Sequence, residues 1–159
     1  MSVKLAKQAV FAAHVPDRTT ASVYPPMFAV KMNGRKKQAL GDYFGLNNFG
    51  VNLTELQAGA RSSLLHAHTR QDEFIYVLDG RLTLILGERE TELVAGMCCG
   101  FPAMGLAHTL VNHTDKPARY LEIGDRTEGD DAKYPEDDLI AHRLNGTWVF
   151  THKDGRPYD

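Results

Sequence analysis

Cysteine is scarce in this sequence: only Cys98 and Cys99 occur, and they are adjacent. Neighbouring side chains on a strand point to opposite faces, so the two thiols could not bind one metal ion there. A disulfide between adjacent residues would strain the backbone. We therefore exclude a fold held together by disulfides and expect one buried and one partly buried thiol in a reducing compartment.

Long apolar segments are also missing. No stretch approaches the roughly 20 apolar residues that a membrane-spanning helix needs. The apolar run from Ala9 to Ala13 is shorter than the roughly 7–15-residue core of a secretory signal, so we expect a cytoplasmic protein without membrane contact. Asn52 and Asn112 match the glycosylation sequon, and without a secretory signal we interpret both matches as chance.

An excess of basic residues is absent as well, because the sequence has 18 basic and 20 acidic residues and a net charge of −2. This balance argues against a nucleic-acid or anionic-lipid partner. The one basic cluster, Arg35–Lys37, is interpreted as a solvated turn. Residues 1–43 contain too many prolines, glycines and turn signals for a helix-turn-helix, which disfavours a DNA-binding regulator.

What the sequence does contain is a succession of short strand-like runs separated by turn residues. At nearly regular spacing and with no long amphipathic helix between them, they predict an all-β sandwich or barrel. Asp79-Gly80, between two apolar runs, is a strong hairpin signal. The predicted strands are Phe49–Gln57, Ser63–His68, Phe74–Leu78, Arg81–Leu86, Thr91–Val94, Met97–Phe101, Thr109–Asn112 and Arg119–Gly124.

The 159 residues suit one domain, which we divide into three segments. Residues 1–43 are expected to form an extended arm with one short helical turn, packing on the barrel or on a partner. Residues 44–125 hold the predicted strands. Residues 126–159 begin with an acidic surface loop at 126–138 and continue in a C-terminal tail, whose apolar Trp148 and Phe150 should pack back.

Three histidines and one glutamate carry the strongest functional signal. His66 and His68 are two residues apart, so they lie on the same face if the segment is a strand. Glu73 follows, and His108 lies further along the chain. Imidazole nitrogens and one carboxylate suit a divalent transition metal. Asp72 competes with Glu73 for the carboxylate role, and the spacing and longer side chain favour Glu73.

These positions fall into two motifs through which the chain resembles the cupin superfamily of double-stranded β-helix, or jelly-roll, barrels. In the first, His66-x-His68, Glu73 and Gly80 fit the usual spacing, and Gly59 lies one residue further away than is usual. In the second, two residues instead of one separate the proline from the next glycine. Its residues are Gly96, Pro102, Gly105, His108 and Asn112.

The resemblance implies that His66, His68, Glu73 and His108 hold one divalent transition metal per chain, either Zn, Mn, Fe or Ni. It also implies a structural or supporting role for Asn112. A metal with open coordination positions would act as a Lewis acid or a centre for oxygen chemistry.

The same resemblance implies a small polar substrate or ligand, because the C-terminal tail is similar to that of small bacterial cupins named as sugar-phosphate isomerases. We therefore predict a sugar or sugar-phosphate isomerase. The alternatives are a non-catalytic cupin that binds a small molecule, and a metal-dependent dioxygenase or lyase using the same site. A purely structural metal ranks last. The sequence identifies no catalytic base and no organic cofactor, and it offers only Gln57 and Arg61 as candidate contacts for an anionic substrate.

A homodimer is the last expectation from the sequence. Edge strands of an open jelly roll need cover, and the segments outside the barrel could supply it. A two-fold interface needs only one self-complementary surface.

Overall fold

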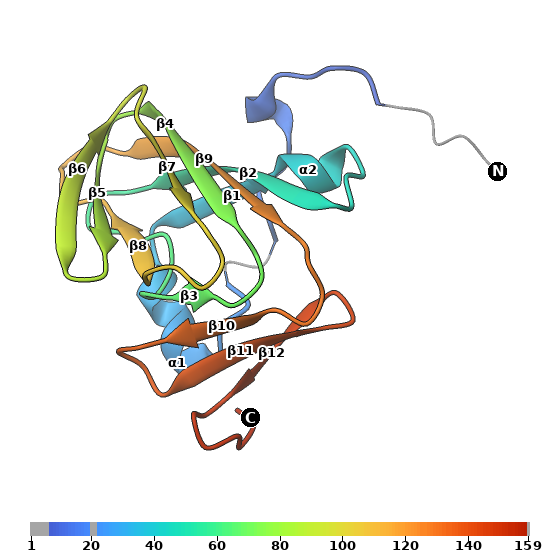
Figure 1. Ribbon diagram of the computed structural model, residues 1–159. Helices are drawn as coiled ribbons and strands as arrows, with labels where there is room; N and C mark the ends of the chain where they lie inside the picture. The colour runs from blue at the N-terminus through green and yellow to red at the C-terminus, as the bar shows by residue number, and fades with distance from the viewer. Residues whose placement is uncertain (1–6, 20–21, 159) are drawn as a thin grey trace.

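The computed structural model describes residues 7–19 and 22–158, which form a mainly antiparallel β structure (Figure 1). The helical segments are single turns: η1 (Ala12–His14), α1 (Pro26–Ala29), η2 (Val30–Met32) and α2 (Leu40–Tyr43). None of the helices in these ranges has both the length and the apolar character needed to cross a bilayer.

The strands form three sheets, of five, three and four strands. The first has the order β1 (Arg35–Ala39), β2 (Phe49–Leu56), β9 (Ala118–Asp125), β4 (Glu73–Asp79) and β7 (Cys98–Phe101). The second has the order β6 (Arg89–Val94), β5 (Arg81–Leu86) and β8 (His108–Val111). The third has the order β12 (Thr147–Thr151), β11 (Leu139–Leu144), β10 (Asp131–Tyr134) and β3 (Ala67–His68). The predicted all-β, jelly-roll type of fold is confirmed.

Each predicted strand segment overlaps one observed strand, but the predicted Asp79-Gly80 hairpin is wrong. β4 pairs with β7 and β9, whereas β5 pairs with β6 and β8, so the chain passes from one sheet to another at this turn. Gly80 has a φ of 80°, and a Cβ there would lie 2.8 Å from the Cα of Ala118. Glycine permits the turn because it adopts a positive φ without strain. Burial of the apolar residues of the two strands then determines which sheet each strand joins.

Arg35–Lys37 is a strand and not the solvated turn expected from its charge. β1 pairs along its whole length with β2, and Lys37 lies opposite Thr54. Strand alternation turns Lys36 outward, where it is exposed, and turns Arg35 and Lys37 toward the interior. The prediction failed because the charge of Lys37 is matched by Glu122 of β9, which is remote in the sequence.

The main core lies between the five-stranded and three-stranded sheets. It is built from inward-facing apolar residues of both, and Tyr120, Leu56 and Val77 are fully buried. Its members are Leu56, Ala60, Ile75, Val77, Leu82, Leu84, Leu93, Phe101, Leu110, Ala118 and Tyr120. The alternation along these strands thus supplies a hydrophobic core without any contribution from the histidines.

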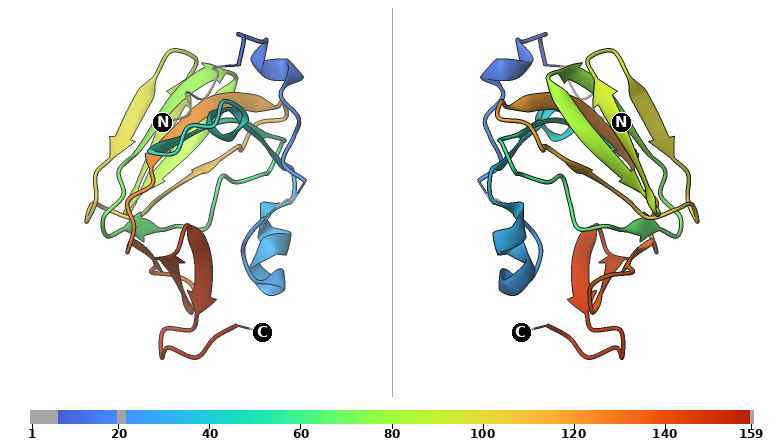
Figure 2. Two further views of the ribbon diagram at one scale, coloured as in Figure 1. Left: turned by 90° about the vertical axis from the view of Figure 1, so that its right-hand side faces the viewer. Right: turned by 90° about the vertical axis from the view of Figure 1, so that its left-hand side faces the viewer.

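A second core joins the two ends of the chain beneath the barrel. Figure 2 shows α1 beside the C-terminal strands in both views. Phe28 and Met32 pack there against Leu139 and Tyr134, and the partly buried Trp148 and Phe150 complete the cluster.

The acidic segment 126–138 is only partly a surface loop, because Asp130 is fully buried and β10 pairs with both β3 and β11. The division of the chain into arm, barrel and tail stays a prediction. Residues 1–6 and 20–21 of the arm and residue 159 of the tail lie outside the described residues.

Candidate metal centre

The predicted ligands come together because two short extended segments pair beside the start of β4. His66 and His108 are direct antiparallel partners: the His108 amide donates to the His66 carbonyl at 2.8 Å, and the His66 amide donates back at 3.2 Å. Two residues after His66, His68 ends β3 on the same face, and the two ring centroids are 5.0 Å apart. This agrees with the expectation from their spacing.

Three imidazole Nε2 atoms surround a single oxygen of Glu73. His108, His68 and His66 approach Glu73 Oε2 at 3.0, 3.4 and 3.5 Å. Candidate ligand atoms of His66, His68 and Glu73 all lie within 4.8 Å of one another. His108 is not in that mutual set, but its ring centroid is 4.7 Å from that of His66. The His-His-Glu group is positioned for a metal ion, and the assignment of all four residues as ligands stays a prediction.

The carboxylate in the cluster belongs to Glu73 and not to its neighbour. Asp72 is exposed, and its Oδ1 accepts the backbone N–H of Ala103 at 2.7 Å. Gly124 lies opposite Glu73 in the sheet, where a Cβ would make an ordinary van der Waals contact of 3.5 Å with Glu73 Cγ.

Hydrogen bonds on the far side of two rings orient their Nε2 atoms toward Glu73. The Leu64 carbonyl lies 3.0 Å from Nδ1 of His66, and an oxygen of Asp130 lies 2.6 Å from Nδ1 of His68. Both of these oxygens are acceptors, so Nδ1 carries the hydrogen in each ring. In the neutral ring, Nε2 then presents a lone pair to the cluster, which is the form that binds metals.

The charges of the cluster favour the binding of a cation. Burial acts against ionisation of Glu73, but its contacts with the three histidines hold the pKa of the carboxyl well below its usual value. Burial likewise opposes the charged form of His68, but Asp130 and Glu73 outweigh it and raise the pKa to about 10. Burial lowers the pKa of His108, which favours its neutral ring.

The residues present therefore fit a divalent metal. Within the described ranges, Glu73 Oε2 is buried and accepts no hydrogen bond of good geometry, although three ring nitrogens surround it. A proton on one ring can bridge only one of these contacts. A metal ion would replace that proton and bind several of these nitrogen and oxygen atoms at once. Nitrogen with carboxylate oxygen is a donor set that suits zinc and related transition metals.

Asp130 is the supporting residue that the sequence analysis missed. It is fully buried, and its second oxygen accepts the backbone N–H groups of Thr69, Arg70 and Gln71 at 3.0, 2.7 and 3.3 Å. These bonds fix the carboxylate that holds His68. Nothing in the acidic run around position 130 distinguishes this aspartate from its exposed neighbours, so only the tertiary structure reveals it.

Replacing Asp130 with asparagine should weaken metal binding by about 10- to 100-fold, the usual cost of losing a partner that orients a metal-bound histidine. The amide can present N–H to Nδ1 of His68, which would move the ring hydrogen to Nε2 and block its lone pair. Calorimetric metal titration measures the effect. Asp131→Asn is the matched control, because Asp131 contacts His142 and not the cluster. Equal losses in both variants would contradict the tautomer argument.

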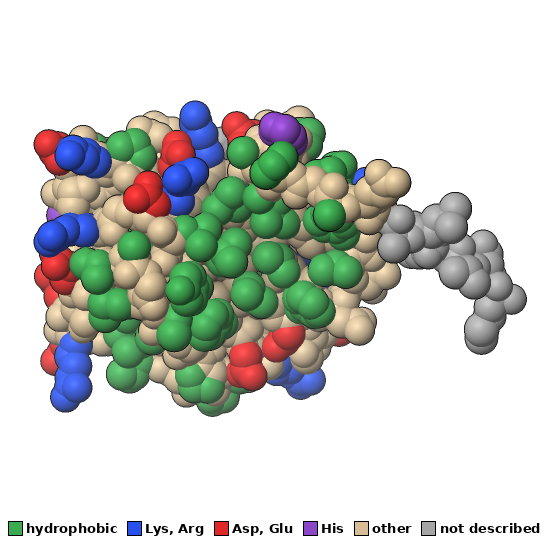
Figure 3. All heavy atoms as spheres, turned by 90° about the horizontal axis from the view of Figure 1, so that it is seen from above, with side chains coloured by type: hydrophobic (Ala, Val, Ile, Leu, Met, Phe, Trp, Pro, Cys, Tyr) green, Lys and Arg blue, Asp and Glu red, His purple; other side chains and the backbone are tan. Residues whose placement is uncertain are grey.

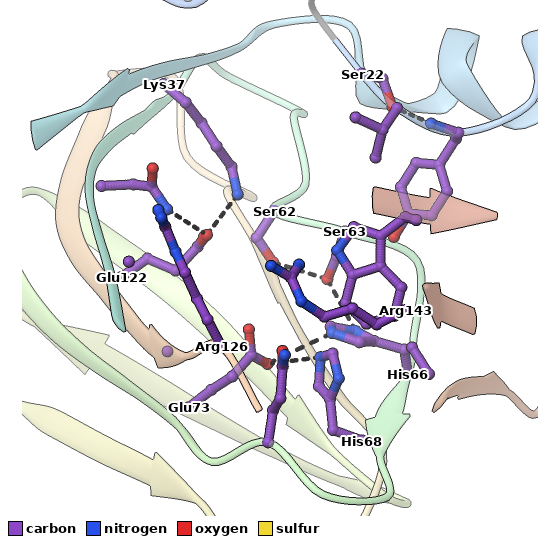
Figure 4. Close-up of a pocket in the computed structure, with 18 of the residues that line it drawn as sticks. Ser22, Lys37, Ser62, Ser63, His66, His68, Glu73, Glu122, Arg126 and Arg143 are labelled. Carbon is purple, nitrogen blue, oxygen red and sulfur yellow. Dashed lines mark hydrogen bonds and ion pairs between the residues drawn. The ribbon is translucent and has the colours of Figure 1, made fainter. Parts of the chain in front are cut away.

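The cluster forms part of the wall of a cavity of about 490 Å³, a volume suited to a small molecule. Opposite charges meet elsewhere on the wall: Nζ of Lys37 is 2.6 Å from Oε1 of Glu122 (Figure 4). Glu122 also accepts from Asn52 Nδ2 at 3.2 Å and from Tyr120 Oη at 3.3 Å. Burial lowers the pKa of Lys37, and the attraction of Glu122 offsets this only in part.

Sheet register explains why these side chains share one cavity. Glu122 pairs with Asn52 on one side and Ile75 on the other, and Glu73 lies two residues before Ile75 on β4. Side chains two residues apart point to the same face, so Glu73, Glu122 and Lys37 all face inward. A lysine–glutamate pair from strands that are far apart in the sequence thus lines the same cavity as the candidate metal centre.

The other residues considered from the sequence lie outside the histidine–glutamate cluster. Gln57 and Arg61 do not line this cavity, and their contact with an anionic substrate stays a prediction. Asn112 is buried and structural: its amide donates to the carbonyls of Leu56 and Lys116 at 2.9 and 2.8 Å. Cys98 and Cys99 are free thiols, but Cys98 is exposed and Cys99 is partly buried, so the expectation of one buried thiol is wrong.

Comparisons with known proteins place these features in context. The family model described as "Cupin domain" matches residues 52–124. A crystal structure from Silicibacter pomeroyi DSS-3, described as a sugar phosphate isomerase from a cupin superfamily, is 40% identical with a TM-score of 0.89. The match covers 96% of this chain and 97% of that one. No curated protein matches the chain.

Two further solved structures extend the likeness. A protein of Acidithiobacillus ferrooxidans, named as a candidate sugar phosphate isomerase, is 31% identical over 76% of this chain and 77% of its own, with a TM-score of 0.71. The polyketide cyclase RemF of Streptomyces resistomycificus is 20% identical over 75% of this chain and 79% of its own, with a TM-score of 0.62. The cyclase shows a shared fold only.

Proposed function

The chain belongs to the cupin superfamily, and from that premise we propose that it is a metal-dependent isomerase of a sugar or sugar phosphate. One observation carries the proposal: the His-His-Glu group and the partly buried Lys37–Glu122 pair line the same cavity. Metal ligands alone are common to many chemistries, whereas an acid–base pair beside them suits proton transfer.

In this proposal His66, His68, Glu73 and His108 hold one divalent ion per chain, either Zn, Mn, Fe or Ni. When bound, such an ion polarises the carbonyl and hydroxyl oxygens of a sugar as a Lewis acid. Stacking of Phe101 on the His108 ring, with centroids 3.7 Å apart, covers one side of the centre with an apolar surface.

Lys37 and Glu122 supply the proton transfers. The Glu122 carboxylate accepts the proton from the carbon next to the sugar carbonyl, and Lys37 donates a proton to the carbonyl oxygen, which gives an enediol. Reversal of these transfers on the neighbouring carbon and oxygen yields the isomeric sugar. The lowered pKa of buried Lys37 makes its ammonium group a better proton donor than an exposed lysine.

The names given to the relatives from Silicibacter pomeroyi and Acidithiobacillus ferrooxidans support a sugar phosphate as substrate. The experiment is incubation of the metal-loaded protein in D₂O with aldose and ketose phosphates of five and six carbons. NMR detects deuterium at the carbon next to the carbonyl, even where net conversion is small. We expect incorporation that a chelator abolishes.

Absence of deuterium incorporation from every sugar tested would contradict the isomerase proposal. Saturable sugar binding without exchange would favour the non-catalytic binding cupin. Oxygen consumption or loss of a carbon fragment would favour the dioxygenase or lyase.

We further propose a homodimer, formed through the outer face of the five-stranded sheet. Phe74, Tyr76 and Leu78 of β4 are 39%, 39% and 45% exposed there, beside Phe49 of β2 at 43%. Figure 3, which looks down on this side of the molecule, shows hydrophobic side chains gathered in the middle of the face. An apolar surface of this kind supports association, and a second copy provides a complementary one.

Light scattering is expected to give twice the chain mass of 17.7 kDa at micromolar concentration. Phe74→Asp should produce a monomer, because it places a charge in the proposed interface. Leu144→Asp is the control, since Leu144 is also an exposed apolar residue (54%) but lies at the end of β11. A monomeric wild-type protein would refute the dimer.

A further inference from the structure

Positive side chains line the cavity around the candidate metal centre: Arg18, Arg35, Lys37, Arg126 and Arg143. Acidic partners account for several of them. Lys37 pairs with Glu122, and Asp42 contacts both Arg126 and Arg18. Arg143 differs, because it forms no ion pair with any residue in the described ranges 7–19 and 22–158.

The Arg143 guanidinium lies at the cavity, and one of its N–H donors has no hydrogen-bond partner among the described residues. Figure 4 shows the side chain pointing into the pocket. Its Cζ lies 5.7 Å from the centroid of the Trp148 ring, its cross-strand partner on β12. Its Nε is buried and has no hydrogen-bond partner among the described residues. A buried donor without an acceptor is costly, so this group is poised to bind an anion.

Arg143 is also connected to the metal centre. Its backbone N–H donates to the Asp130 carbonyl at 2.8 Å, and Asp130 holds His68. The Trp148 ring is also close to the cluster, since its centroid is 5.8 Å from that of His68. Trp148 thus lies next to both Arg143 and His68, and an anionic group bound to Arg143 would lie within the same cavity as the cluster.

We infer that Arg143 is the main residue of a subsite for the phosphate group of the substrate, to which Arg35 adds positive charge from β1. This inference rests on the proposed function and names its substrate as the phosphorylated sugar. Guanidinium groups bind phosphate through parallel N–H donors. The two arginines line the cavity from two different sheets, and donors from two sheets suit the tetrahedral oxygens of phosphate better than the planar oxygens of a carboxylate.

Trp148 provides a direct probe, because it is the only tryptophan in the chain. The metal-loaded protein is titrated with inorganic phosphate and, separately, with acetate, while Trp148 emission is recorded. Calorimetry repeats each titration, since a substitution at Arg143 also changes the surroundings of Trp148. Phosphate should bind saturably to the wild type, and acetate should bind far more weakly.

Arg143→Gln should weaken phosphate binding by at least about tenfold, because the charge and the paired donors are lost. Arg143→Lys keeps the positive charge but not the paired N–H donors. Its phosphate affinity should therefore lie between those of the wild type and Arg143→Gln. Metal content should not change in either variant. Arg156→Gln is the matched control, since Arg156 is exposed, pairs with Asp154 and does not line the cavity.

Unchanged phosphate affinity in both Arg143 variants would overturn the inference and place the phosphate on the metal or elsewhere. Equal affinity for acetate would overturn the choice of phosphate. The inference and the isomerase proposal can fail separately. Arg143-dependent phosphate binding without sugar exchange refutes only the isomerase, whereas exchange with an unchanged KM for sugar phosphate in Arg143→Gln refutes only the subsite.

Discussion

The His68→Ala protein is expected to carry little metal while still folding as a barrel. The wild type should hold about one divalent ion per chain, and loss of one of its few ligands should lower the affinity steeply. The fold should survive because the main core consists of apolar residues from two sheets and includes none of the histidines. A zinc finger behaves differently, since it unfolds without its metal.

Elemental analysis and circular dichroism measure these two outcomes. His113→Ala is the control, because His113 is exposed and outside the cluster. Thermal unfolding adds a second test: a chelator should lower the Tm of the wild type toward that of His68→Ala and leave the variant unchanged. Glu73→Gln should be milder, since it keeps an oxygen donor but loses the negative charge. Full metal occupancy in His68→Ala would show that His68 is not a ligand.

Lys37→Met is expected to reduce isomerisation by about 10²- to 10⁴-fold, the usual contribution of a positioned acid or base. Lys36→Met is a closely matched control, because Lys36 is the preceding residue of β1, is exposed and faces away from the cavity. Metal content should be the same in both variants. Equal losses of activity, or none in Lys37→Met, would remove Lys37 from the mechanism.

Glu122→Gln should produce a similar loss, and the double variant should lose little more than either single one, because the two residues act as a unit. The pH profile separates a chemical role from a structural one. The acid form of Lys37 is present below its lowered pKa, so activity should fall as the pH rises through that value. Lys37→Arg should lose most of the activity at every pH, because arginine keeps its proton and cannot donate it to the carbonyl oxygen.

Local pattern was enough to predict much of the barrel. Alternating apolar residues and turn residues identified the eight strands from β2 to β9, since a strand buried on one face repeats every two residues. The same periodicity, together with the two motifs, pointed to Glu73 and to the three histidines that lie around it. Strands outside this region were missed, because β1 is polar in composition and β10 begins within an acidic run.

The sequence by itself predicted the eight strands from β2 to β9, the residues of the candidate metal centre and the choice of Glu73 over Asp72. These are relations between residues close in the chain, or between motifs of known spacing. Only the tertiary structure revealed the support from Asp130, the Lys37–Glu122 pair and the position of Arg143 in the same cavity. Each of these features depends on the pairing of strands distant in the sequence. The charged residues involved are of the same types as their solvated neighbours, and only their burial in the folded chain distinguishes them.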